Sequence, residues 1–127
     1  MKKAISEKAT VCIDFKKSRI RIFKETLHAM DDPAFVQLLI NPQKRIFCIR
    51  RSISEEVFAQ RIKWESLNKK DCVEIYSRSL MTELLTLNEE WSTRKSYRVF
   101  GTFNLREELV WFDLDDAVLI EEEKYDG

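Results

Sequence analysis

The sequence predicts a mixed α/β (α+β) fold in which two similar strand–helix–strand–strand units pack into one domain or a barrel-like pseudo-dimer. Short stretches alternate apolar and polar residues, helical spacing is confined to a few brief segments, and the order of these segments repeats. A length of 127 residues is typical of a single domain, so residues 1–127 are treated as one.

The first unit is expected over residues 11–51. Alternation on both sides of the turn at 16–18 predicts a hairpin, and the turn residues before Pro33 end the helix that follows it. The expected elements are strands at 11–15 and 20–22, a helix at 24–30, and strands at 35–40 and 45–51.

A linker over 53–61 joins this unit to a second one over 61–120. Ser54 before two glutamates is typical of a helix start, so a two-turn helix is expected as far as Arg61, with a strand through Ile62 and Trp64 after it. The elements expected next are a strand at 73–76, a helix whose apolar stripe is Leu80, Leu84, Leu85 and Leu87, and strands at 97–103, 109–113 and 117–120.

The two units show a short sequence match. Residues 20–27 align without a gap on residues 73–80, and both stretches run apolar, charged, apolar, aromatic, polar, polar, hydroxyl, leucine. Strand-to-helix junctions reuse the same residue types, so chance similarity is the alternative to an internal duplication. The flanking elements follow in the same order on both sides, which favours duplication.

The composition excludes several classes of site. Two glycines cannot build a Gly-rich phosphate loop, and Cys12, Cys48 and Cys72 lack the close spacing of a zinc or redox motif and are expected to be small buried thiols. With His28 as the single histidine, no metal site or proton shuttle built from two histidines is available. We therefore expect no catalytic residue, no metal and no cofactor, and predict that the protein is not an enzyme.

Two further groups have both a functional and a structural interpretation. Asp113, Asp115 and Asp116 have the oxygen ligands that magnesium prefers, but a solvated strand end is the expected explanation. Aromatic residues can stack on single-stranded nucleic acid, but their spacing is that of core positions. These aromatic residues are Trp64, Trp91, Trp111, Tyr76, Tyr97 and Phe100.

Positive charge is concentrated in the first part of the chain. Residues 1–52 carry a surplus of seven positive charges, and residues 101–127 a surplus of seven negative ones, although the net charge of the whole chain is zero. These regions either neutralise each other in space or form a basic face and an acidic tail. The candidate nucleic-acid-binding residues are Lys16, Lys17, Arg19, Arg21 and Lys24, joined by Lys44, Arg45, Arg50 and Arg51.

The stretch Ile13-Asp14-Phe15-Lys16-Lys17-Ser18-Arg19-Ile20-Arg21-Ile22 resembles the opening of AbrB-type swapped-hairpin domains. That pattern has an acidic residue, a turn, Gly-Arg, a strand ending in Ile-Pro, and a short helix. Here Ser18 replaces the glycine and Phe23 the proline. Two such units in one chain resemble the MraZ branch, and the resemblance implies DNA binding through basic residues of the hairpins, usually in dimers or larger rings.

Two functions follow as expectations. The first is a non-catalytic binding or assembly module whose partner is another protein or a second copy of itself. The alternative is a DNA-binding transcriptional regulator of AbrB/MraZ-like type that holds duplex DNA. The N-terminus lacks the apolar stretch of a signal peptide and no run of about 20 apolar residues occurs, so we expect a cytoplasmic protein without membrane contact.

Overall fold

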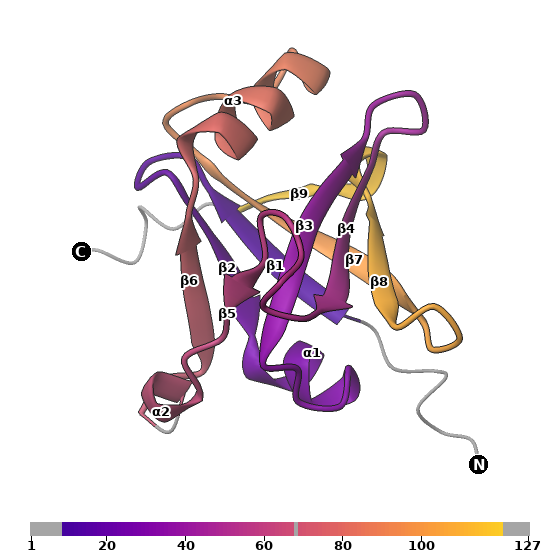
Figure 1. The fold of residues 1–127 in the computed structure, drawn as a ribbon. Coiled ribbons are helices and arrows are strands. Elements are labelled where there is room, and N and C mark those ends of the chain that lie inside the picture. Colours follow the sequence, from indigo (N-terminus) through magenta and orange to yellow (C-terminus); the bar gives the residue numbers. More distant parts are fainter. Residues whose placement is uncertain (1–8, 68, 121–127) are drawn as a thin grey trace.

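A computed structural model describes residues 9–67 and 69–120 of the chain (Figure 1). Within these residues, nine strands join one sheet and three α-helices accompany it. The strands are β1 (Ala9–Asp14), β2 (Arg19–Phe23), β3 (Phe35–Asn41), β4 (Ile46–Ser52), β5 (Gln60–Arg61), β6 (Cys72–Tyr76), β7 (Ser96–Asn104), β8 (Leu109–Asp113) and β9 (Val118–Ile120). The helices are α1 (Lys24–Ala29), α2 (Trp64–Leu67) and α3 (Arg78–Leu87), with a 3-10 turn at Leu114–Asp116.

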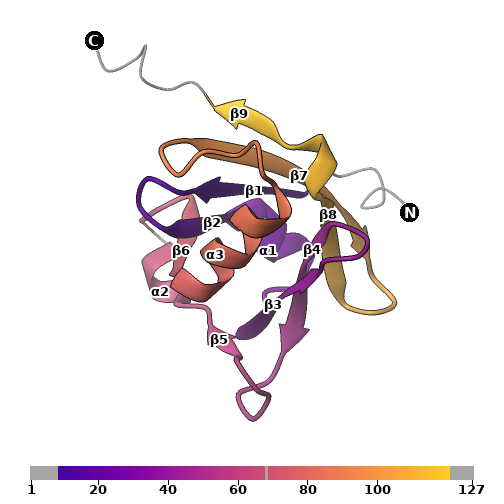
Figure 2. The ribbon, with the colours of Figure 1, turned by 90° about the horizontal axis from the view of Figure 1, so that it is seen from above.

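The sheet is antiparallel throughout and curls into a half-barrel (Figure 2). Its strand order is β5-β3-β4-β8-β7-β1-β2-β6. The long strand β7 pairs with β1 along one edge, and with β9 and then β8 along the other. Strands β6 and β5 therefore lie at the two ends of the order.

The apolar core fills the concave side of this sheet. Val11, Ile13, Ile20 and Ile22 alternate along the first hairpin and have no exposed surface, because one side of each strand faces inward. Helix α3 lies at one end of the half-barrel and α1 at the other (Figure 1), and both contribute buried residues to the core. No helix of the described residues is long and apolar enough to span a membrane.

The hairpins β3–β4 and β7–β8 have closely similar turns. In the first, the Lys44 backbone N–H donates to Asn41 Oδ1 at 3.2 Å, and in the second the Glu107 N–H donates to Asn104 Oδ1 at 3.3 Å. The residue before the second strand has a positive φ in both, 56° and 58°. Asparagine at the start of a turn favours this geometry because its side chain bonds nearby backbone.

The predicted mixture of strands and helices is confirmed, with strand as the larger part. Two local predictions are wrong. Residues 54–58 form turns in place of a helix, and Trp64–Leu67 is a helical turn in place of a strand.

Both errors have a physical reason. The stretch after Ser54 is too short to sustain a helix without tertiary contacts, and Phe58 has a φ of 61°, which no helix contains. Trp64 is held by a long-range contact, because its Nε1–H donates to the Pro33 carbonyl at 2.8 Å and its ring stacks on His28. Tertiary contacts thus override the local alternation.

Gly101 marks the closest approach inside the sheet. It pairs with Ala9 on β1 and Phe112 on β8, so two small residues face one large ring. A methyl group on Gly101 would lie 2.6 Å from Phe112 Cδ2 and 2.7 Å from the Trp111 carbonyl oxygen. The position therefore requires glycine for space.

Replacing Gly101 by alanine is expected to lower the free energy of unfolding by about 1–3 kcal/mol through overpacking. Denaturant unfolding measures the change. Thr102→Ala, at the neighbouring exposed position, is the control and should change stability by less than about 0.5 kcal/mol. Equal stability of the Gly101→Ala variant and the wild type would contradict the close packing of β7 on β8.

Candidate anion-binding site

The convex face of strands β7, β1, β2 and β6 carries rows of polar side chains. Because residues paired across an antiparallel sheet share a face, the register puts Arg98, Cys12, Arg21 and Glu74 in one row across the four strands. Ser96, Asp14, Arg19 and Tyr76 form the next row. Residues separated by more than 80 positions in the chain are thus neighbours on this face.

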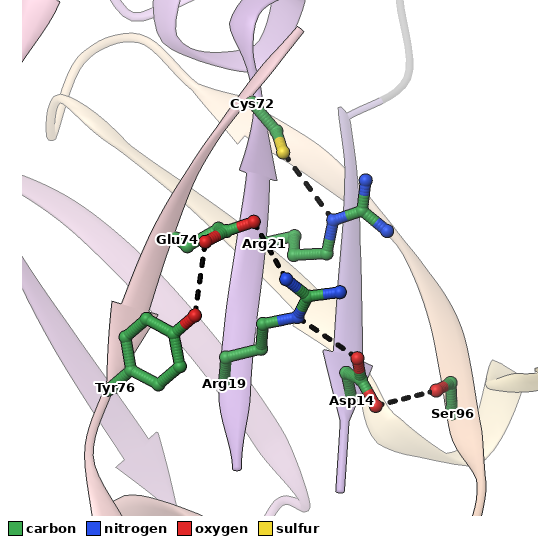
Figure 3. Close-up of polar contacts among 7 residues, drawn as sticks. All are labelled: Asp14, Arg19, Arg21, Cys72, Glu74, Tyr76 and Ser96. Atoms are coloured by element: carbon green, nitrogen blue, oxygen red, sulfur yellow. Dashed lines mark hydrogen bonds and ion pairs between the residues drawn. The ribbon is translucent and has the colours of Figure 1, made fainter. Parts of the chain in front are cut away.

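Arg19 is the centre of an ion-pair network (Figure 3). Its Nε donates to Asp14 Oδ2 at 3.0 Å, and its Nη1 donates to Glu74 Oε2 at 2.7 Å. The Arg19 side chain keeps only 14% of its surface exposed. The network joins β1, β2 and β6, and Tyr76 adds a hydrogen bond to Glu74.

Asp14 is buried, with 5% of its surface exposed. Burial alone would raise its pKa, but hydrogen bonds from Ser96 and Arg19 and the charge of Arg19 outweigh it, so the pKa is lowered from its usual value. The Ser96 hydroxyl donates to Asp14 Oδ1 at 3.0 Å, which leaves each carboxylate oxygen with a partner. Asp14 is therefore ionised and neutralised inside the network.

Arg21 has a different environment from Arg19. Its Nε donates to Cys72 Sγ at 3.5 Å, and its guanidinium lies 5.9 Å from the centroid of the Phe23 ring. Its pairing partner on the adjacent strand β1 is Cys12. Burial raises the pKa of the Cys12 thiol, and the charge of Arg21 opposes this rise without cancelling it. A neutral thiol next to Arg21 leaves the positive charge of the guanidinium available to an anion.

A depression with a volume of about 440 Å³ lies on this face. Arg98, from β7, and Arg21, from β2, flank Cys12 on the strand between them. Adjacent strands are about 4.8 Å apart, so the two arginine backbones are separated by about 10 Å. We name this depression the basic pocket; its lining includes Lys16, Lys17, Arg19, Arg21, Arg98 and one carboxylate, Asp14.

The structure brings four of the five predicted site residues together in the basic pocket. Lys16 and Lys17 are exposed in the turn between β1 and β2, and Arg19 and Arg21 follow on β2. Lys24 does not line the basic pocket and begins α1. Arg98 was not among the predicted residues, although its polar position in an alternating strand is a signal that it faces outward.

The other arginines of the first unit bind residues outside the basic pocket. Arg45 binds Asp115 and the carbonyl of Leu87, and Arg51 donates to the carbonyls of Met30 and Asp31. Arg50 bonds Gln37 and Glu56. These residues serve the fold and lie outside the basic pocket.

The remaining candidates for chemistry have structural partners. His28 Nδ1 lies 2.7 Å from Asp32 Oδ1, within hydrogen-bond distance, and the His28 ring stacks on Trp64. Asp113 Oδ1 accepts from the Asp115 N–H at the 3-10 turn. No group of three or more His, Cys, Asp or Glu side chains suited to a metal ion occurs within 9–67 and 69–120.

The aromatic residues divide between the core and the surface. Trp91 stacks on Tyr97 with ring centroids 4.5 Å apart, and both contact Phe15, so these three pack together as expected. The core prediction is wrong for Tyr76 and Phe100, which are 61% and 39% exposed. They lie on the convex face, on β6 and β7.

The chain was compared with family models, with curated proteins and with solved structures, and none of them matches.

Replacing Arg19 by methionine is expected to destabilise the protein by about 1–3 kcal/mol near neutral pH, because the buried Asp14 carboxylate loses its charged donor. The pKa of Asp14 is lowered in the fold, so its contribution is present above about pH 4 and is lost as the pH falls through the folded-state pKa. Denaturant unfolding at pH 7 and pH 3 should therefore show a smaller difference between variant and wild type at pH 3.

The matched control is Arg98→Met, on the same face but exposed, which should alter stability by less than about 0.5 kcal/mol. Equal losses for the two variants, or a loss for Arg19→Met that is the same at both pH values, would show that Asp14 and Arg19 do not stabilise each other.

Proposed function

We propose that this protein is a non-catalytic binding module that holds duplex DNA at the basic pocket through phosphate contacts. The observation that carries the proposal is the pair Arg21 and Arg98, which flank the neutral thiol of Cys12 on three adjacent strands. Lysine and arginine side chains that neutralise phosphates release counterions, and this supplies affinity without reading bases.

The turn between β1 and β2 extends the same surface. Lys16 and Lys17 are exposed there, at the end of the basic pocket where β1 ends. Arg19 contributes little to binding in this proposal, because Asp14 and Glu74 already neutralise it. The resemblance of residues 13–22 to AbrB-type hairpins supports the choice of duplex DNA as the anion.

The internal duplication belongs to the same proposal. Three features support it: the order β2-α1-β3-β4 recurs as β6-α3-β7-β8, the turns at Asn41 and Asn104 share their hydrogen bonds, and β2 pairs with β6. In that pair Arg21 lies opposite Glu74, the residue that the sequence match assigns to it. A local twofold axis through this pair would relate the two units.

The DNA proposal is tested by fluorescence anisotropy of a labelled duplex over a salt series. The surface has four exposed or partly exposed basic residues: Lys16, Lys17, Arg21 and Arg98. Four phosphate contacts predict a slope of log K against log salt of about −3 to −4, at about −0.9 per contact. The double variant Lys17→Ala/Arg98→Ala should weaken binding and flatten the slope by about two.

The control is Lys44→Ala/Arg106→Ala, which removes two exposed basic side chains from the turns of β3–β4 and β7–β8. It should leave the slope close to the wild-type value. Absence of binding at low salt, or equal effects of the two double variants, would contradict DNA binding at the basic pocket.

A further inference from the structure

The curled sheet stops short of closing between β3 and β6. Strand β5 pairs only with Phe35 and Val36, so from Gln37 to Asn41 strand β3 pairs with β4 alone. Strand β6 pairs only with β2. We name the region between these two strand edges the seam.

A groove with a volume of about 320 Å³ lies at the seam. Leu38 and Leu39 line it from β3, Leu80 from α3, and Val57 and Phe58 from the loop before β5. Glu83 is the charged residue among the described residues that line it. Four neutral polar residues, Gln37, Gln60, Ser77 and Ser79, complete its lining. The groove is therefore partly apolar and partly polar, with one negative charge on the α3 side.

Apolar side chains around the seam are unusually exposed. Phe58 is 85% exposed, Val57 68% and Leu39 42%. Single exposed apolar residues are ordinary, but a cluster beside an unpaired strand edge is typical of a surface that binds another chain.

The opposite side of the sheet shows what the seam lacks. There β1 lies between β2 and β7 and pairs with both over most of its six residues. On the other side, the described residues supply β3 with a two-residue strand partner, β5, and this strand does not pair with β6. Strands β3 and β6 run in the same direction, because six antiparallel steps lead from β6 to β3 in the strand order. One more strand antiparallel to both would complete an all-antiparallel barrel.

The chain's own residues before β5 do not supply this strand. The β5 register would place Phe58 opposite Leu38, but the φ of 61° at Phe58 turns the chain away from the extended conformation. The Gln37 side chain bonds the Val57 carbonyl oxygen at 2.8 Å, which holds the loop beside β3 without strand pairing. The backbone edge of β3 from Leu38 to Asn41 therefore has no second strand partner among the described residues, and a strand added there would displace the contact between Gln37 and Val57.

We propose that the seam binds an extended peptide segment of another protein, which adds as a strand antiparallel to β3 and β6. Its backbone pairs with the two free edges, and its inward residues are apolar and contact Leu38 and Leu80. A basic residue of the peptide pairs with Glu83. In strand addition of this kind, main-chain hydrogen bonds provide affinity and alternate side chains provide specificity.

The test selects peptides from a random heptapeptide library displayed on phage, with the whole protein as target. The expected peptides alternate apolar and polar residues and contain one lysine or arginine. The best peptide is then synthesised with a fluorescent label, and its Kd is measured for the wild type and for Glu83→Lys and Leu39→Lys, two exposed positions where substitution leaves the core intact.

Glu83→Lys is expected to weaken binding about fivefold, the effect of one exposed ion pair, and a peptide with its basic residue changed to glutamate should recover the loss. Leu39→Lys should also weaken binding. The matched control is Leu119→Lys, an exposed apolar residue on β9, which should bind as the wild type does.

A second form of the peptide, N-methylated at alternate amides, separates strand addition from simple apolar docking. It retains the side chains but loses backbone donors, so its binding is expected to fall at least about tenfold. The proposal is overturned if no peptide is enriched or if the N-methylated peptide binds equally well. It is also overturned if the selected peptides bind Glu83→Lys, Leu39→Lys and the control Leu119→Lys with the same Kd. It is also overturned if the protein sediments as a dimer and the peptide neither binds to this dimer nor dissociates it, because the seam then holds a second copy.

Discussion

A single antiparallel sheet has to supply both the wall and most of the core of this protein. It curls so that one side of nearly every strand is inside, and the two helices α1 and α3 cover the ends of the half-barrel (Figure 1). Alternation along each strand then decides the role of each residue: one neighbour packs in the core and the next faces solvent. Both candidate binding surfaces follow from this constraint, one on the convex face and one at the unclosed edge.

The convex face separates structural charge from charge available for binding. Arg19 faces two carboxylates, and the resulting network joins three strands at the side of the sheet where β6 has a partner on one edge only. Arg21 and Arg98 face a neutral thiol and remain able to hold an anion. Asp14 and Glu74 therefore neutralise Arg19, and the basic pocket keeps a positive surplus beside it.

Local patterns predicted most of the strands, because alternation and turn residues act over a few positions. The hairpins around residues 16–18, 41–44 and 104–108 agree with the structure for this reason. The sequence could not show that Arg19 is neutralised, since Glu74 lies 55 positions away and reaches it only through the pairing of β2 with β6. Arg98 joins the basic pocket through the same kind of long-range pairing, that of β7 with β1.

The account depends most on the sheet being open between β3 and β6. Amide hydrogen exchange measured residue by residue by NMR tests this directly, since a paired amide exchanges slowly and a free edge amide exchanges quickly. The account predicts slow exchange along β1, which has partners on both edges, and fast exchange of alternate amides in β6 and in residues 38–41 of β3. Uniform protection of β6 and of β3 at the level of β1 would mean that the barrel is closed, and would contradict it.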